Sequence, residues 1–357
     1  MRIIVDISHP AHIHLFRNFA KRMIDKNHDV LFTAREKDCT IELLDYYQFN
    51  YICFGKNYKR FIGKLWGLFR FSSLLIKAAG TFKPDIFISH SSVYASIASF
   101  FIRKPHISLD DTGNYEQLLV VKLFSKAILT PDSYHKQLGK KQISYNSFHE
   151  LAYLHPDEFI PNPRVLHNIG LKEGVPFAIL RFVSWEASHD LYNKGLSLND
   201  KEKLIELLEG KIKIFISSES DLPKKFAKFK LTAPLHEIHD LLYYASLYIG
   251  EGATMASESA LLGTPAIYIN SAFAGTIEYQ AKSGWLFWFK TYPGVSEKAI
   301  EIINAPESQE NKTKNRKQIL NNHINLTKYL IWFVENYPSS IKKAKENTKN
   351  NSNTQRA

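Results

Sequence analysis

Cysteine is scarce in this sequence, and long hydrophobic runs are absent. Cys39 and Cys53 are the only two cysteines among 357 residues, so we expect neither a disulfide framework nor a cysteine-based metal cluster. No apolar stretch reaches the roughly 18 residues that a membrane-spanning helix needs. The N-terminal segment meets an acid at Asp6, too early for a signal peptide. These absences predict a cytoplasmic protein.

Basic residues outnumber acidic ones, but the excess is local. The formal net charge is +11. Residues 56–77 contain six Lys or Arg and no acid, and residues 338–357 contain five against one acid. The rest of the chain is nearly neutral. This distribution excludes the spread-out cationic surface of a nucleic-acid-binding groove.

Short apolar runs alternate with helical patterns along most of the chain. The predicted buried strands lie at residues 3–7, 30–32, 51–54, 85–88, 106–109, 127–129, 177–180, 212–216, 247–249 and 266–269. Strands separated by segments of helix length indicate right-handed βαβ units and parallel sheets. We therefore expect an α/β protein of GT-B architecture, with two Rossmann-like doubly wound domains facing a central cleft.

Composition suggests where the domains begin and end. A cluster of Pro and Gly interrupts the alternation at residues 156–176 and indicates a linker. The Lys/Asn/Ser/Thr composition from Pro338 onward cannot bury a core, so a disordered tail is expected there. The predicted segments are an N-terminal Rossmann-like domain at 1–160, a linker at 161–172, a C-terminal Rossmann-like domain at 173–310, a helical segment at 311–337 and a disordered basic tail at 338–357. Neither domain has a Gly-x-Gly-x-x-Gly fingerprint after its first strand, so NAD binding has little support.

The most informative pattern lies between residues 247 and 265. A predicted strand leads through a turn of small residues into a helix that ends at Gly263. Such a turn leaves unpaired amides at the start of the helix, where an anionic diphosphate can bind. Glu258 lies one turn into this helix. Its carboxylate either accepts two hydrogen bonds from a ribose diol or is merely solvated.

The motif Gly252-Ala253-Thr254-Met255-x-x-Glu258, followed by Gly263 and Pro265, resembles the donor site of GT-B glycosyltransferases. By this motif the chain is similar to the peptidoglycan lipid-intermediate N-acetylglucosaminyltransferase and to UDP-N-acetylglucosamine 2-epimerase. The resemblance implies that the amides of the turn hold the diphosphate and that Glu258 binds the ribose hydroxyls. It also implies that the backbone from His236 to Ile238 recognises uracil.

Over residues 1–335 the chain resembles an uncharacterised family of GT-B-like proteins found near polysaccharide genes. Its markers here are His9-Pro10-Ala11-His12 and the segment 181–190. In that segment Arg181, Ser184 and His189 could contact phosphate or sugar. Trp185 either stacks on a sugar ring or packs in the protein. The pattern of the segment differs from that of the epimerases.

Histidines follow the first predicted strand at positions 9, 12 and 14. Pro10 and the start of a helix scatter their side chains, and no carboxylate or cysteine accompanies them, so no metal site is predicted. His12 matches the histidine of the related transferases. It would act as a general base or bind phosphate, because the ordinary pKa of histidine is about 6.5; alternatively it only caps or packs the turn.

Acidic residues follow the strand predicted at 106–109. Adjacent acids in a glycine-containing turn are common helix caps. Because the turn lies at the carboxyl end of a strand, they could instead act as acid and base. The resemblance to the epimerases implies this role for Asp110 or Asp111, and for Glu116.

The basic segment 57–77 has the pattern of an amphipathic helix. Its apolar face would comprise Tyr58, Phe61, Ile62, Leu65, Leu68, Phe69, Leu75 and Ile76. Lys59, Arg70 and Lys77 would project from the other side. The helix would either lie on an anionic membrane surface, on the inner face of the cell membrane, or pack its apolar face into the core.

Together these features predict transfer of a sugar from a nucleoside-diphosphate donor, expected to be UDP-linked, to an acceptor in surface polysaccharide or glycolipid synthesis. The expected catalytic residues are His12, Asp111 and Glu116, with neither a metal nor another cofactor. The partners would be a nucleotide sugar and a lipid-linked or polysaccharide acceptor. The sequence leaves open a UDP-N-acetylhexosamine 2-epimerase and a non-catalytic nucleotide-sugar-binding protein. It does not determine the base, the sugar or the acceptor.

Overall fold

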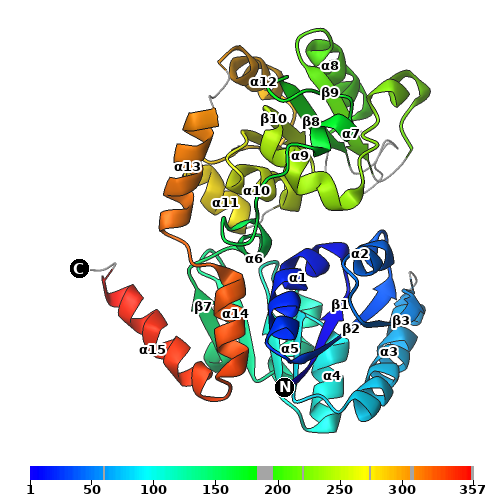
Figure 1. The fold of residues 1–357 in the computed structure, drawn as a ribbon, viewed down its shortest axis with the longest axis vertical. Coiled ribbons are helices and arrows are strands. Elements are labelled where there is room, and N and C mark those ends of the chain that lie inside the picture. The colour runs from blue at the N-terminus through cyan, green and yellow to red at the C-terminus, as the bar shows by residue number, and fades with distance from the viewer. Residues whose placement is uncertain (59–60, 183–195, 219–220, 273–274, 306–308, 355–357) are drawn as a thin grey trace. The chain divides into compact units, whose positions relative to one another are not determined.

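The computed structural model describes residues 1–357 except 59–60, 183–195, 219–220, 273–274, 306–308 and 355–357 (Figure 1). The chain divides into two compact units. Unit 1 comprises Met1–Glu158 and His323–Ala357, and unit 2 comprises Phe159–Asn322.

Unit 1 is built on a parallel sheet of seven strands in the order β3-β2-β1-β4-β5-β6-β7. The strands are β1 (Arg2–Ile7), β2 (Asp29–Glu36), β3 (Tyr51–Lys56), β4 (Ile86–His90), β5 (His106–Leu109), β6 (Ala127–Pro131) and β7 (Gln142–Tyr145). Consecutive residues of the central strands are buried, as in Ile3, Ile4 and Val5 of β1. Burial on both faces is what a parallel sheet covered by two helix layers requires.

Two groups of helices cover this sheet. The helices of unit 1 are α1 (Pro10–Asp25), α2 (Thr40–Tyr46), α3 (Phe61–Phe82), α4 (Val93–Ile102), α5 (Tyr115–Phe124), α6 (Leu151–Leu154), α14 (Leu326–Glu335) and α15 (Ser339–Thr354), with the short 3-10 helix η1 (Gly139–Lys141). Helix α1 packs against α2, α6 and α14. Helix α4 packs between α3 and α5.

Buried polar contacts join β1 to its neighbours. The carboxylate of Asp6 accepts hydrogen bonds from both terminal nitrogens of Arg35, at 2.7 and 3.0 Å, and from the hydroxyl of Thr33 at 2.6 Å. The hydroxyl of Ser92, which caps α4, also donates to Asp6. Because a buried carboxylate without partners would be costly, this network fixes the ends of β1 and β2 against the start of α4.

Unit 2 has a parallel sheet of five strands in the order β12-β11-β10-β8-β9. The strands are β8 (Phe177–Phe182), β9 (Lys213–Ser218), β10 (Leu247–Gly250), β11 (Ala266–Ile269) and β12 (Phe287–Phe289). The helices are α7 (Val165–Asn168), α8 (Leu198–Leu208), α9 (Ile238–Tyr244), α10 (Ala253–Leu261), α11 (Gly275–Lys282), α12 (Val295–Asn304) and α13 (Gln309–Asn321), with the 3-10 helices η2 (Lys224–Phe229) and η3 (Leu235–Glu237).

The predicted α/β class and the two doubly wound sheets are confirmed. Every predicted strand is present, but β7 and β12 were not predicted. Strand β7 is a short edge strand in which polar Gln142 and Ser144 alternate with buried Ile143 and Tyr145, so it lacks a continuous apolar run. Strand β12 has only three residues, all partly exposed.

The C-terminal segments differ from the prediction. The helical segment expected at 311–337 consists of two helices, α13 in unit 2 and α14 in unit 1. The tail expected to be disordered forms α15, which packs against α14 and β7. Within the described side chains of α15, the buried ones are Ser340 and Ala344, spaced four residues apart, so small residues provide its contact face there. The prediction of disorder looked for large apolar residues and missed this face.

Helix α3 contains most of the basic segment 57–77. Phe71, Leu75 and Ala79 are buried at four-residue spacing and pack into the core of unit 1. Phe69 was predicted on the apolar face but is 64% exposed, and Trp66 is also exposed. The prediction is wrong for Phe69, because a residue two positions before Phe71 lies about 200° around the helix from it. The buried residues on the described part of this side therefore serve the core. Lys59 and the side chains of Phe61, Ile62 and Leu65, which were also predicted for this helix, lie outside the described residues.

Among the helices of the described residues, none combines the length and the hydrophobicity needed to cross a bilayer.

Candidate functional site

The strand orders identify one edge in each unit where ligands usually bind. In unit 1 the order reverses between β1 and β4, and in unit 2 it reverses between β8 and β10. In open α/β sheets, ligands bind at the carboxyl ends of the strands near such a reversal. His12 follows β1 and His90 ends β4, while Arg181 lies near the end of β8 and Gly252 follows β10.

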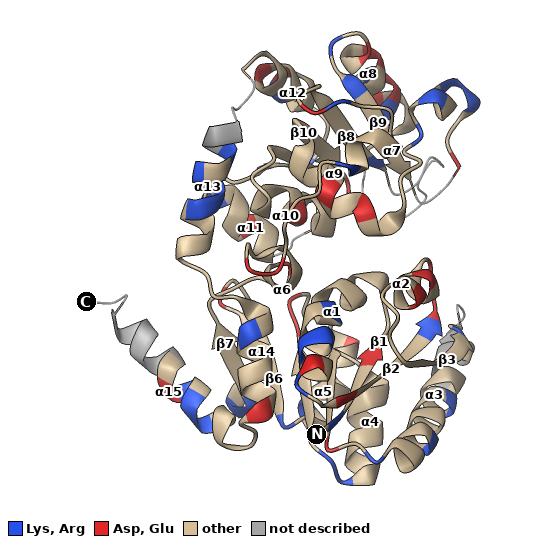
Figure 2. Ribbon diagram, in the orientation of Figure 1, with Lys and Arg blue, Asp and Glu red and all other residues tan. Residues whose placement is uncertain are grey.

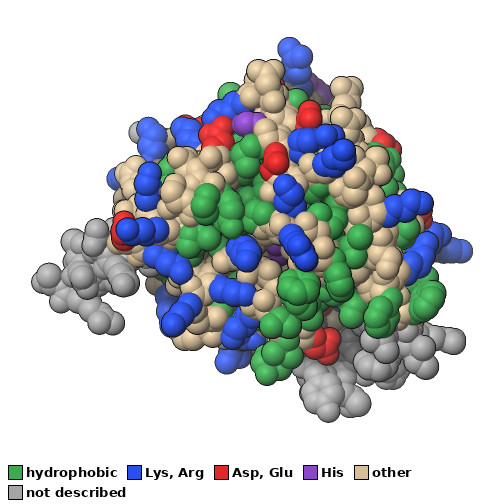
Figure 3. Space-filling model, turned by 90° about the horizontal axis from the view of Figure 1, so that it is seen from below, with side chains coloured by type: hydrophobic (Ala, Val, Ile, Leu, Met, Phe, Trp, Pro, Cys, Tyr) green, Lys and Arg blue, Asp and Glu red, His purple; other side chains and the backbone are tan. Residues whose placement is uncertain are grey.

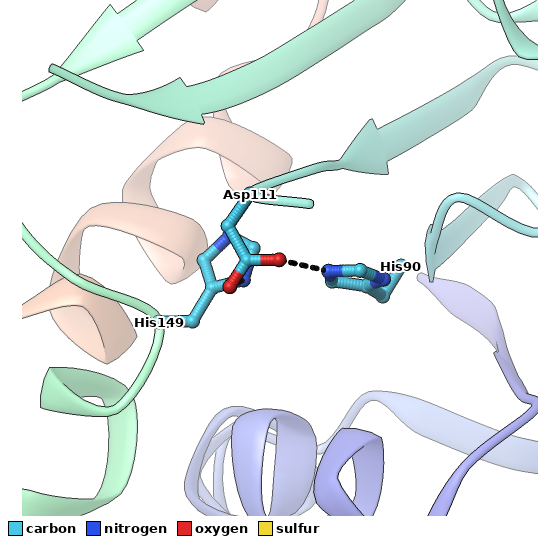
Figure 4. A group of neighbouring side chains, drawn as sticks. All are labelled: His90, Asp111 and His149. Atoms are coloured by element: carbon cyan, nitrogen blue, oxygen red, sulfur yellow. Dashed lines mark hydrogen bonds and ion pairs between the residues drawn. The ribbon is translucent and has the colours of Figure 1, made fainter. Parts of the chain in front are cut away.

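A cluster of two histidines and one aspartate lies at this edge of unit 1 (Figure 4). Nε2 of His90 lies 2.9 Å from Oδ1 of Asp111, and Nδ1 of His149 lies 3.1 Å from Oδ2 of the same carboxylate. The two imidazole rings are 5.1 Å apart, edge to face. The residues come from the end of β4, the turn after β5 and the turn after β7, so the sheet itself brings them together.

The two adjacent acids of the turn after β5 have different roles. Asp110 is fully buried; its carboxylate accepts hydrogen bonds from the amide of Gly113 at 2.7 Å and the hydroxyl of Ser91 at 2.6 Å. Gly113 has a φ of 70°, which glycine adopts without strain. Asp110 therefore holds the turn, and Asp111 is the acid that contacts the histidines.

Protonation of the cluster follows from its contacts. Burial opposes the imidazolium of His90, but the hydrogen bond and charge of Asp111 outweigh it and raise the pKa of His90. Burial likewise opposes the Asp111 carboxylate, but His149 and His90 outweigh it and hold the pKa of Asp111 well below its ordinary range. Asp111 is thus an ionised carboxylate that accepts one hydrogen bond from each imidazole ring.

His12 adjoins the cluster, with its ring 4.5 Å from that of His90. Burial and the neighbouring His90 and His9 hold the pKa of His12 well below its ordinary value, so its ring is neutral. The amide of Ser8, which can only donate, lies 3.4 Å from Nδ1 of His12. The proton of the neutral ring is therefore on Nε2, and His12 offers a donor there rather than a base.

Two buried polar atoms near Asp111 have no hydrogen-bond partner among the described residues. They are Nε2 of His149 and the hydroxyl oxygen of Tyr145, whose rings stack at 6.3 Å. His149 is 7% exposed and Tyr145 4%. A buried polar atom without a partner is uncommon and marks a place where a ligand or water completes the hydrogen bonding. Because Nδ1 of His149 faces Asp111, Nε2 is the ring nitrogen that remains for such a partner.

The cluster also offers a set of donors that suits a metal. The ligating atoms of His90, Asp111 and His149 lie within 4.8 Å of one another, and zinc and other transition metals accept such donors. In this structure, however, each carboxylate oxygen of Asp111 already accepts a hydrogen bond from a different histidine. The three histidines close together in the sequence, His9, His12 and His14, are not part of this set, and His9 instead caps α1 by accepting a hydrogen bond from the amide of Ala11.

Glu116, the third residue expected in catalysis, is exposed in the first turn of α5. Among the described residues, no hydrogen bond, ion pair or ring contact that we find joins it to the cluster.

In unit 2 the predicted strand, turn and helix are β10, residues 251–252 and α10. Gly252 is the N-cap residue of α10, and no side chain caps its amides. Ala253 and Thr254 begin the helix, where the partial positive charge of the helix favours an anion. Gly250 must be glycine, because a Cβ there would lie 2.3 Å from the hydroxyl of Tyr248.

Glu258 of α10 is buried rather than solvated. Its Oε1 lies 3.0 Å from Nε2 of His239, a buried residue of α9 that the sequence analysis did not select. The contact fixes the carboxylate on the side of α10 that faces α9. Glu258 is thus positioned by a partner nineteen residues earlier in the chain.

The turn before α10 is anchored by a second buried acid. Glu251 accepts a hydrogen bond from the amide of Leu196 at 2.7 Å and lies 3.1 Å from the ammonium of Lys201. The side chains of Glu251 and Lys201 are 5% and 4% exposed. Because Lys201 balances the charge of Glu251, the acid does not oppose an anion bound at the start of α10.

The remaining predicted contacts are only partly described. Arg181 donates a hydrogen bond to the hydroxyl of Ser217 at 3.0 Å. His236 lies in η3 and Ile238 begins α9; both are partly buried. Ser184 and His189 lie outside the described residues, as does Trp185.

Comparisons with known proteins give a family and a fold. A family model described as "Protein of unknown function (DUF354)" matches residues 1–324. The uncharacterised protein MJ0665 of Methanocaldococcus jannaschii is 24% identical over 274 residues, which cover 74% of this chain and 80% of that protein.

Solved structures share the fold at low sequence identity. A putative UDP-N-acetylglucosamine 2-epimerase from Listeria monocytogenes has a TM-score of 0.66 and 12% identity, covering 91% of this chain and 92% of its own. The UDP-GlcNAc 2-epimerase of Neisseria meningitidis, bound to UDP-GlcNAc, has a TM-score of 0.65 and 11% identity, covering 93% and 98%. The spinosyn forosaminyltransferase SpnP has a TM-score of 0.62 and 12% identity, covering 96% and 99%.

These similarities establish the GT-B-like fold that the sequence predicted. The chain belongs to the DUF354 family.

Proposed function

We propose that the protein transfers a sugar from a nucleoside diphosphate, expected to be UDP, to a hydroxyl acceptor in surface polysaccharide or glycolipid synthesis. The observation that carries the proposal is the His90–Asp111–His149 cluster, which is partly buried and lies at the strand reversal of unit 1. Structural neighbours that include a UDP-GlcNAc-bound epimerase and a forosaminyltransferase support a nucleotide sugar as the substrate.

In the proposed reaction, unit 2 binds the nucleotide and unit 1 provides the proton acceptor. The uncapped amides at the start of α10 bind the diphosphate, and Glu258 binds the ribose hydroxyls. Nε2 of His149 takes the proton of the acceptor hydroxyl while that oxygen bonds to the anomeric carbon. The bond from this carbon to the diphosphate breaks, and the diphosphate leaves with the bonding electrons, stabilised by the helix amides.

In this proposal Asp111 holds His149 in the tautomer that a base requires, and His12 donates from Nε2 to a substrate oxygen. This changes the role expected for His12, because its Nδ1 faces the amide of Ser8. No metal takes part in the proposed chemistry, so activity should persist in EDTA. Stoichiometric metal in the purified protein, with activity lost on its removal, would contradict this.

A 2-epimerase-like reaction is the second candidate. One observation favours it: a single carboxylate orients two imidazoles, and paired titratable groups of this kind can serve as acid and base. Incubation with UDP-N-acetylhexosamine alone separates the candidates. Formation of an isomer or release of UDP without an acceptor supports the epimerase, whereas consumption of the donor only with an acceptor supports the transferase.

A further inference from the structure

The outer surface of α4 and α5 exposes large hydrophobic side chains. We call this surface the α4–α5 face; it comprises Phe100, Phe101, Tyr115, Leu119 and Leu123. Each of these side chains is more than half exposed, with Leu123 at 68%. The two helices pack against each other, and the ring of Phe100 lies 4.9 Å from that of Phe124 of α5. The contact joins both helices into one apolar surface.

The sequence of α5 accounts for this arrangement. Leu118 and Val121 are buried toward the sheet. Residues 115, 119 and 123 recur every four positions and form a second stripe, on the outer side. Single exposed hydrophobic residues are normal, but a stripe next to a pair of phenylalanines is the kind of patch that marks an interaction site.

Basic residues lie at or just after the ends of α4 and α5 in the chain, or in η1, which contacts the end of α5. They are Arg103, Lys104, Lys122, Lys126, Lys140 and Lys141. The ammonium of Lys141 donates to the carbonyls of Lys122 and Leu123, at 2.7 and 2.9 Å, and so holds a positive charge at the end of α5. Among the described residues, the acid that we find paired with one of these six basic residues is Asp85, which lies 4.0 Å from Lys104.

The basic surface continues onto α15. Lys345 donates to the carbonyl of Lys140 at 2.6 Å, which brings a helix that also carries exposed Lys342 and Lys343 to the same side of unit 1. Figure 2 shows Lys along α15. Seen from below, hydrophobic side chains lie at the surface among Lys and Arg, with fewer Asp and Glu (Figure 3).

The combination of exposed apolar and basic residues indicates which kind of partner would cover the α4–α5 face. A symmetric pair of chains joined through the face would bring its basic residues near their own copies, and like charges repel. An anionic bilayer complements the lysines and accepts Phe, Leu and Tyr at its interface. We propose that the α4–α5 face docks the protein on anionic lipid. The docking itself does not depend on the sugar-transfer chemistry, whereas its consequence for the acceptor rests on the proposed function.

The position of the α4–α5 face also has a consequence for the kind of acceptor that could reach the cluster. Tyr115 begins α5 four positions after Asp111, so the apolar stripe starts beside the turn that carries Asp111. A chain lying on the bilayer along α5 would keep that turn near the membrane interface. Lipid-linked acceptors would then reach the cluster from the membrane.

Vesicle co-sedimentation tests the proposal on the full-length protein. We expect binding to phosphatidylglycerol-containing vesicles at low salt, weaker binding at high salt and little binding to pure phosphatidylcholine. The double variant Phe101→Ser/Leu123→Ser should lower the partition coefficient at least tenfold with unchanged thermal unfolding. Lys122→Glu/Lys126→Glu should lower it by a factor of roughly 25 or more, since each cation near the surface contributes about fivefold.

The double variant Trp66→Ser/Phe69→Ser removes the exposed aromatics of α3 and is the matched control, expected to bind as the wild type does. Three results would overturn the proposal. The wild type could fail to bind anionic vesicles, or the control could lose binding while Phe101→Ser/Leu123→Ser retains it. In the third, sedimentation shows that the wild type is a dimer and that Phe101→Ser/Leu123→Ser is a monomer, while the wild type does not bind vesicles. The face would then join two copies of the chain. Nucleotide titration of each protein measures the proposed function separately.

Discussion

Nδ1 of His149 lies 3.1 Å from Oδ2 of Asp111, although the two residues follow different strands of unit 1. An aspartate placed in this way fixes both the orientation and the tautomer of the imidazole, and leaves Nε2 with a lone pair. The same carboxylate binds His90 through its other oxygen. In the proposed reaction, this arrangement makes His149 rather than His12 the general base.

Replacement of His149 by Gln should therefore lower kcat by about 10²- to 10⁴-fold, the usual contribution of a general base. Nucleotide affinity should not change, because in the proposed reaction His149 contacts the acceptor hydroxyl and the nucleotide is held by α10. The measurement is the steady-state release of UDP in the presence of acceptor. His135→Gln, at an exposed histidine of unit 1, is the control and should retain wild-type kcat. Full activity in His149→Gln would remove this residue from the mechanism.

Glu258→Ala should weaken nucleotide binding. Loss of a charge-assisted contact with the ribose costs about 1.5–3 kcal/mol, which corresponds to roughly 10- to 150-fold in Kd. His239→Gln should cause a smaller loss, because His239 only positions the carboxylate. Calorimetric titration with UDP measures both, and thermal unfolding checks that the variants fold. Glu297→Ala, at an exposed acid of α12, should bind as the wild type does. Unchanged affinity in a folded Glu258→Ala protein would assign Glu258 to packing alone.

Lys201→Met should destabilise unit 2 by about 3–5 kcal/mol, because it leaves the buried Glu251 without its cation. Denaturant unfolding measures the change. The double variant Lys201→Met/Glu251→Gln removes the unpaired charge and should recover part of the loss. If the single and double variants unfold alike, the pair does not balance charge at the turn before α10.

Stability should fall as the pH is lowered from about 7 to about 5. Burial lowers the pKa of His106 to about 3, and its ring instead bonds the hydroxyls of Ser89, Ser96 and Ser125. The unfolded chain then binds the proton more readily than the folded chain below the ordinary pKa of about 6.5. The free energy of unfolding should decrease by about 2 kcal/mol from this residue alone over this range.

Urea unfolding at the two pH values tests this sign. His106→Gln should be less stable than the wild type near pH 7 but should lose less stability on acidification. An equal loss in both proteins would place the acid sensitivity elsewhere.

Local patterns predicted the fold well. Apolar runs such as 3–7 and 247–249 were long enough to identify strands, and a glycine turn identified the start of α10. Edge strands β7 and β12 were missed, because little of an edge strand needs to be apolar. Helix α15 was missed because Ser340 and Ala344 bury small surfaces that composition does not reveal.

The candidate site was predicted only in part, because its contacts are not local. Asp111 and Glu258 were selected from motifs, but their partners lie in other elements: His90 ends β4, His149 follows an unpredicted strand, and His239 lies in α9. His90 could have been selected from the sequence, because it stands at the end of a predicted strand. His149 could not have been selected in the same way, because the strand that precedes it, β7, was not predicted.

The central claim is that unit 2 binds a nucleotide sugar at the start of α10. Calorimetric titration of the full-length protein with UDP and UDP-N-acetylglucosamine tests it most directly. The account predicts saturable binding of both ligands at one site per chain, with UDP displaced by the sugar nucleotide and both weakened in Glu258→Ala. Absence of binding by UDP-, GDP- and CMP-linked sugars to the folded protein would contradict it.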